Sequence, residues 1–136
     1  MKKIKLALLA LVLIAGTTYG QSKAAPWPEM KAFHSIMAGT FHPAEDGDLK
    51  PLRAKADTLF LAAKTWQSSK IPADFKPKET AETLEKLVKQ TSVISDKVKG
   101  GADDKELTKL ISDAHDTFHK IVGECKKTGE HEGHGH

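Results

Sequence analysis

The residues best suited to chemistry lie in one stretch near the end of the chain, DAHDTFHKIVGEC, which runs from Asp113 to Cys125. Two histidines, His115 and His119, are four residues apart in this stretch, and it ends on the only cysteine. Because residues four apart project from the same side of a helix, the two imidazole rings can chelate one metal ion. The alternative is a helix that carries two partly exposed histidines without a ligand. Cys125 lies about 15 Å beyond His115 along a helix, too far to join them.

The apolar pattern around the two histidines predicts where their rings lie. An amphipathic helix is expected over residues 103–125, with the centre of its apolar face at Leu107. At 3.6 residues per turn, His115 falls at the boundary of the core and His119 nearer the rim. Asp116 stands beside them and is a candidate to orient one ring as a hydrogen-bond acceptor.

A second set of candidate ligands lies in the segment MKAFHSIMAGTFH. Met30, His34 and Met37 fall on neighbouring turns of a helix that is predicted to pack against the last one. We therefore expect a metal site in which His34 and one of the two methionines join His115 and His119. For each methionine, ordinary packing in the core is the alternative.

The depth of His34 in the bundle follows from an assumed register between the first and last helices. If His42 lies level with the start of the last helix, near Asp104, then His34 lies near Ser112. That position is within about one turn of His115. The expectation is therefore that His34 faces the histidine pair across the bundle.

His42 presents a different possibility, because it lies about 12 Å from His34 along a continuous helix. Both can bind one ion only if the helix breaks early, at Gly39. The sequence HPAEDGD instead offers a separate loop cluster of nitrogen and oxygen ligands, made of His42, Glu45, Asp46 and Asp48. A solvated turn between helices is the alternative interpretation.

The last nine residues, TGEHEGHGH, have no apolar side chain and are expected to form a mobile His-rich tail over residues 128–136. They contain His131, His134 and His136. His-rich tracts often bind Ni, Cu or Zn. Because an unstructured segment cannot fix the geometry of its ligands, we expect the tail to collect metal at most.

The first twenty residues differ from the rest. MKKIK is basic, LALLALVLIAG is apolar, and small residues follow, a pattern typical of a signal peptide. Cleavage is expected after Gly20, with a cut after Ala24 or an uncleaved anchor as the alternatives. An exported chain, periplasmic or secreted, is therefore expected, with a short linker over residues 21–26 and no membrane association after cleavage. The whole chain has 21 basic and 18 acidic residues, and three of those lysines lie in this segment. The remainder is balanced in charge, which gives no basis for nucleic-acid binding.

Four segments show a helical period and none shows sustained strand alternation. They cover residues 27–42, 48–66, 79–99 and 103–125, separated by proline- or glycine-containing links. Asp48 is the expected N-cap of the second segment, and Asp103 with Glu106 forms a capping-box pattern before the fourth. These features predict an all-α, antiparallel up-down-up-down four-helix bundle over residues 27–127. A homodimer through Trp27 or Trp66 is possible for a bundle of this size.

The stretch ISDAHDTFH resembles the haem-attachment motif of the cytochrome c-prime family, C-x-x-C-H-D-x-F/Y-R. His115, Asp116 and Phe118 match its central part. Ile111 and Ala114 stand where the family has its cysteines, so covalent haem attachment is ruled out. The resemblance rests more on architecture than on this motif, and it covers about residues 29–126.

The soluble b-type relatives of that family suggest a second alignment, in which Phe118 and His119 match an aromatic–histidine pair. The resemblance then implies a non-covalent haem b, held by His115 or His119 on one side. The family's methionine ligand comes from the first helix, where Met30, His34 or Met37 could occupy its place.

Two features favour a bare ion over haem. Haem needs one axial histidine from the last helix, whereas this helix has two, and the first helix and the tail add more. We therefore expect a transition-metal-binding bundle for Zn, Cu or Ni that serves sequestration, delivery or sensing. Haem b in electron transfer is the first alternative, and a structural or partner-binding bundle the second. No positioned nucleophile or general base indicates an enzyme.

Overall fold

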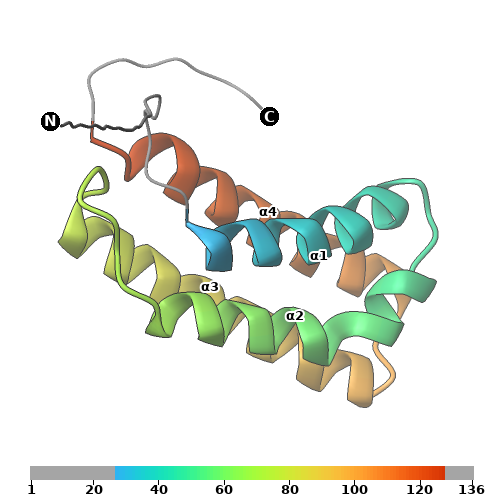
Figure 1. The fold of residues 1–136 in the computed structure, drawn as a ribbon. Coiled ribbons are helices and arrows are strands. Elements are labelled where there is room, and N and C mark those ends of the chain that lie inside the picture. The colour runs from blue at the N-terminus through green and yellow to red at the C-terminus, as the bar shows by residue number, and fades with distance from the viewer. Residues whose placement is uncertain (1–26, 128–136) are drawn as a thin grey trace, which may run out of the picture.

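The computed structural model describes residues 27–127 and shows four helices joined by short links (Figure 1). They are α1 (Pro28–Glu45), α2 (Lys50–Ser68), α3 (Pro77–Lys99) and α4 (Asp104–Glu124). Each helix packs closely against the next one in the chain, and α4 packs back against α1. Contacts across the diagonal are made by long side chains, such as Trp66 of α2 with Phe118 of α4. This arrangement confirms the predicted all-α, up-down-up-down bundle.

Two predictions lie outside the described residues, namely the signal peptide with its linker and the His-rich tail. Within residues 27–127, no helix is long and apolar enough to cross a bilayer. The same range contains no strand, only an isolated antiparallel bridge between Phe75 and Lys126.

The first helix is longer than predicted, because it continues through Pro43 to Glu45. Proline lacks an N–H and therefore removes only one helical bond, the one to the carbonyl of Gly39. So close to the end of a helix this loss is small, and the Pro43 carbonyl accepts hydrogen bonds from the backbone N–H groups of Asp46 and Asp48 at 3.0 and 2.8 Å. The predicted end of this helix at residue 42, just before Pro43, was wrong.

Two other helix starts differ slightly from prediction. The second helix begins at Lys50, and the carboxylate of Asp48 accepts a hydrogen bond from its backbone N–H at 3.1 Å. The third begins at Pro77, since proline is well suited to the first turn, where its missing N–H has no helical partner.

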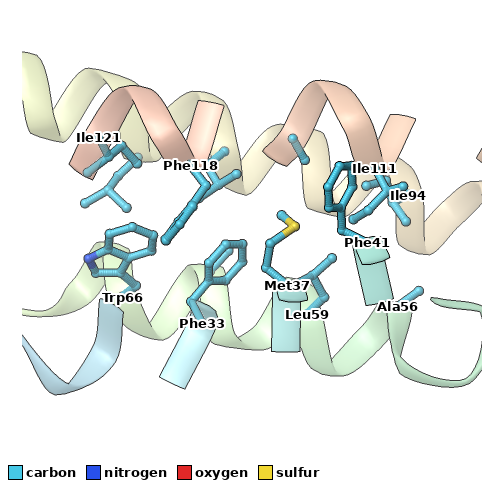
Figure 2. Packing of buried hydrophobic residues seen from close by; sticks show 14 of the residues in the cluster. Phe33, Met37, Phe41, Ala56, Leu59, Trp66, Ile94, Ile111, Phe118 and Ile121 are labelled. Carbon is cyan, nitrogen blue, oxygen red and sulfur yellow. The ribbon is translucent and has the colours of Figure 1, made fainter. Parts of the chain in front are cut away.

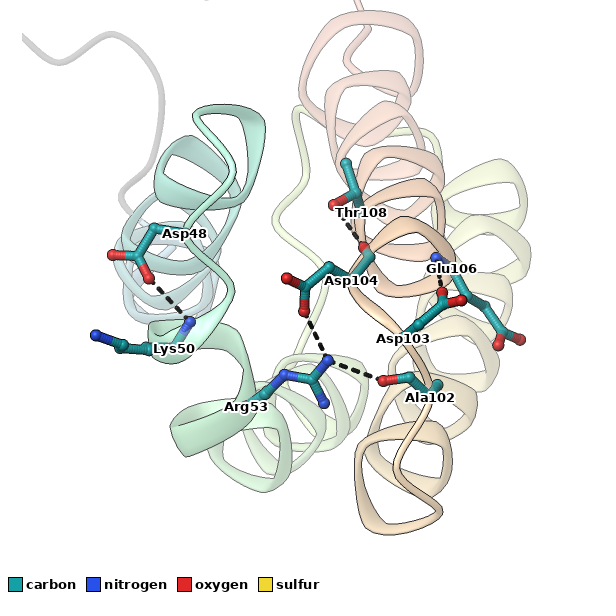
Figure 3. A network of polar contacts seen from close by, with 8 residues as sticks. All are labelled: Asp48, Lys50, Arg53, Ala102, Asp103, Asp104, Glu106 and Thr108. Carbon is teal, nitrogen blue, oxygen red and sulfur yellow. Dashed lines mark hydrogen bonds and ion pairs between the residues drawn. The ribbon is translucent and has the colours of Figure 1, made fainter.

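The predicted cap of α4 is confirmed. The Asp103 carboxylate accepts a hydrogen bond from the backbone N–H of Glu106 at 2.9 Å. Glu106 does not complete the capping box, because its carboxylate pairs with Lys97 at 2.9 Å instead. In the same turn, the Arg53 guanidinium donates to the carbonyl of Ala102 and the carboxylate of Asp104, which ties α2 to the link between α3 and α4 (Figure 3).

The core is built from the inward faces of all four helices and is rich in aromatic rings at the end where α1 begins (Figure 2). Trp27 and Trp66 are 2% and 0% exposed, and their rings meet edge to face at a centroid distance of 5.5 Å. Neither tryptophan side chain is therefore exposed on the single chain, and the homodimer stays a prediction. Cys125 is buried, and its thiol lies 3.7 Å from the hydroxyl of Thr83.

Candidate metal centre

Four histidines lie along the seam between α1 and α4, the least extensive of the four helix contacts. His34 and His42 come from α1, and His115 and His119 come from α4. Phe41 and Phe118 lie between them and make ring contacts with one or more of these imidazoles. The seam therefore combines metal-binding side chains with the aromatic edge of the core.

The closest pair is the one that the sequence predicted. Nε2 of His115 lies 3.2 Å from Nε2 of His119, and the rings are nearly perpendicular, at 78°. This distance fits a hydrogen bond from one neutral ring to the other, with the donor set by the tautomer. It also fits a shared metal ion, because two bonds of 2.0–2.1 Å to nitrogen would enclose an angle of about 100°.

His115 is held in its neutral form by its surroundings. Its pKa is lowered to about 4, mainly because burial removes water from the charged form and secondly because His119 lies beside it. The nearby Asp116 acts in the opposite direction, while His42 and His34 lower the pKa slightly further. Since metals bind the deprotonated nitrogen, this ring is ready to coordinate at neutral pH without losing a proton.

Phe41 of α1 covers one face of the His115 ring. The two rings are stacked almost in parallel, with 3.7 Å between their centroids and 10° between their planes. Phe41 is itself 6% exposed, so it anchors the imidazole against the core. Sequence reasoning missed this contact, although Phe41 belongs to the apolar stripe of the first helix, because the stripe does not reveal which residue it meets on α4.

The position of His34 corrects the assumed register. Its ring stacks on Phe118, with 4.9 Å between centroids and 19° between planes, rather than lying level with Ser112. The offset is six residues, nearly two turns of helix. Packing of Phe33 against Phe118, at 5.9 Å, accompanies this register. His34 is exposed. The Phe118 ring on which it stacks also contacts the His119 ring, with 5.5 Å between their centroids.

His42 is the imidazole of α1 that lies nearest to the pair. Its ring centroid is 6.3 Å from that of His115, and its Nδ1 is 3.9 Å from a carboxylate oxygen of Glu45. The helix is continuous through Gly39, so the early break that would let His34 and His42 share an ion is absent.

The predicted loop cluster does not form a metal site. The Asp48 carboxylate accepts a hydrogen bond from the backbone N–H of Lys50, whereas Leu49 is the N-cap of α2, so the prediction of Asp48 as the N-cap was wrong. Throughout residues 27–127, no three His, Cys, Asp or Glu side chains lie close enough together to hold one ion. The predicted set of His34, a methionine and the histidine pair is therefore not assembled, and the pair stands as a two-ligand arrangement.

Both methionines follow the core-packing alternative. Met37 is fully buried among Phe33, Phe41 and Leu59, and its thioether lies within the apolar interior (Figure 2). Met30 is partly buried and packs against the same core. This burial favours core packing, and a role for either methionine as a ligand stays a prediction.

Comparison with known proteins does not assign this chain to a family. No family model matches the chain, and neither a curated protein nor a solved structure shows significant similarity to it. The resemblance to cytochrome c-prime therefore stays a hypothesis.

Proposed function

We propose that this protein is an exported four-helix bundle that binds a transition-metal ion through His115 and His119. The observation that carries the proposal is the convergence of the two Nε2 atoms to 3.2 Å. The low pKa of His115, which keeps that ring neutral, supports it. Export follows from the sequence of the first twenty residues alone.

The ligands available favour zinc, copper(II) or nickel. Neutral imidazoles suit all three ions, whereas a thioether would shift the preference toward copper(I). Because Met37 packs in the core, the proposal contains no thioether ligand. His42 is the nearest additional imidazole, and Glu45 is placed to accept a hydrogen bond from its Nδ1 after a small side-chain movement.

A bare ion fits this seam better than haem b does. Haem between α1 and α4 would need space in the core beside the histidines, and Phe33, Trp66 and Phe118 fill that region with ring centroids 5.4–5.9 Å apart. Two surface grooves lie between α3 and α4, and neither is lined by a histidine or a methionine. A haem protein would therefore have to repack its aromatic core around the cofactor.

Sequestration, delivery or sensing of metal suits such a site better than catalysis. Both rings are only partly buried, so an ion can enter and leave without unfolding of the bundle. We propose no catalytic role, because no nucleophile with an adjacent base is part of the proposed site.

The direct test is isothermal titration with Zn²⁺ of a chain in which His131, His134 and His136 are replaced by alanine. We expect saturable binding at no more than one ion per chain. His115→Ala or His119→Ala should weaken it by more than about 100-fold, since groups that only orient a ligand already contribute 10–100-fold.

The matched control is Met37→Leu, which keeps the volume of a core residue and should leave Zn²⁺ affinity unchanged. Two results together would refute the proposal. Zn²⁺ binding would be lost when the tail histidines are replaced, and the Zn²⁺ affinity of the full chain would be unchanged by His115→Ala or His119→Ala.

A further inference from the structure

We propose that the metal ion on His115 and His119 is shared between two copies of the chain, which meet through the outer face of α1 next to the pair. This inference rests on the proposed function and identifies the partner that completes its site. Two observations carry it, namely the incomplete ligand set and an exposed surface without charge.

The ligand set is half of what a structural zinc site needs. Such sites are almost always four-coordinate and tetrahedral. The pair supplies two nitrogens, and residues 27–127 contain no group of three suitable side chains in reach of one ion. A twofold axis through the ion brings the same pair from a second copy, because a twofold interface places identical patches opposite each other. Four imidazole nitrogens then complete the coordination.

The surface beside the pair has the composition of an interface. Residues 32–44 contain no Asp, Glu, Lys or Arg, although 29% of the whole chain is charged. The exposed residues of this run, which we name the uncharged face, are Ala32, His34, Ser35, Gly39 and His42. Depletion of charged residues distinguishes the centre of protein interfaces from the remaining surface.

The shape of the uncharged face also suits a second helix. Three of its five residues are Ala, Ser or Gly, and no atom lies within 4 Å of the position that a side chain at Gly39 would occupy. A neighbouring backbone can therefore approach closely. His34 and His42 are the two histidines of this face, and their rings contact Phe118 and Phe41, which border the pair.

His42 offers the competing way to complete the site within one chain. Its ring is 6.3 Å from that of His115, and rotation of its exposed side chain could bring a third nitrogen to the ion. The two arrangements differ in stoichiometry and mass. Sharing gives half an ion per chain and a dimer, whereas closure by His42 gives one ion per chain and a monomer.

The experiment is sedimentation velocity with and without Zn²⁺, on the chain with the three tail histidines replaced by alanine. We expect a monomer without metal, a dimer at half an ion per chain, and reversal by a chelator. His115→Ala and His119→Ala should each abolish the metal-dependent dimer.

A charged residue placed on the uncharged face tests whether dimerisation depends on this surface as well as on the metal ion. Ser35→Arg should keep the chain monomeric with Zn²⁺ present and weaken metal binding by at least tenfold, because each ion then has one pair only. Thr58→Arg, which adds the same charge to an exposed position on α2, should dimerise like the parent. Circular dichroism checks that both variants remain helical.

Each remaining outcome is decisive. One ion per chain at monomer mass, with affinity lowered by His42→Ala, would overturn sharing and leave the proposed function standing. A dimer that is independent of metal or unaffected by Ser35→Arg would also overturn sharing. If Zn²⁺ does not bind at all, the proposed function fails together with this inference.

Discussion

At the residue scale, the chemistry of the seam depends on how Phe41 covers His115. An exposed histidine has a pKa near 6.5. Stacking under Phe41 and proximity to His119 make the charged ring unfavourable, and the pKa falls to about 4. The ring therefore stays neutral through the range in which histidines usually gain a proton.

This shift predicts a specific dependence on pH. Between about pH 6.5 and pH 4, the unfolded chain binds a proton at His115 and the folded chain does not, so the free energy of unfolding falls as the pH is lowered through that window. Proton NMR of the imidazole ring should show a titration midpoint near 4 for His115. The midpoint should rise in His119→Ala, which removes the second-largest cause. A midpoint near 6.5 in the parent chain would contradict the packing described.

Much of this residue-scale picture could be predicted from the sequence. Four-residue spacing on a helix is enough to place His115 and His119 on one side, and the apolar pattern put both near the edge of the core. The stacking partner could not be predicted, because it depends on the register between two helices. The same uncertainty misplaced His34, which stacks on Phe118 instead of facing the pair.

At the element scale, local signals predicted the helices better than their exact ends. Asp103 caps α4 as expected, since a carboxylate before a helix satisfies an N–H that has no helical partner. Pro43 was misjudged because a proline in the last turn costs little. Interhelical register leaves no comparable local signal, since it is set by how side chains such as Phe33 and Phe118 fit together.

The capping contact gives a prediction for α4. Asp103→Ala should destabilise the fold by about 1 kcal/mol, because it removes the side-chain acceptor of the Glu106 N–H. Chemical denaturation followed by circular dichroism measures this difference. Asp103→Asn retains an acceptor and serves as the control. Equal stability of the parent and Asp103→Ala would show that the cap contributes nothing.

At the scale of the whole molecule, the bundle closes along the seam that contains the candidate site. The other three helix contacts are more extensive, and α1 and α4 meet through histidine and phenylalanine rings. An ion bound to His115 and His119 at this seam would stabilise the folded chain by mass action, because it binds the folded state and not the unfolded one. A second copy against α1 would cover the uncharged face at the same time.

The whole molecule resembles a haem protein in its four helices but not in the packing of its core. The predicted four-helix architecture is confirmed, but the aromatic residues that a haem would displace are packed together around Trp66. Architecture alone could not separate these possibilities from the sequence, since the same bundle can enclose a cofactor or a solid core.

The central claim is that His115 and His119 bind the ion through Nε2, and nitrogen-15 NMR of the imidazoles tests it most directly. The full chain, labelled with nitrogen-15, is titrated with Zn²⁺ while all the histidine ring signals are followed. We predict that the Nε2 signals of His115 and His119 move together to metal-bound positions at the lowest Zn²⁺ additions, before those of the tail. Zn²⁺-induced changes confined to His131, His134 and His136 would contradict the account.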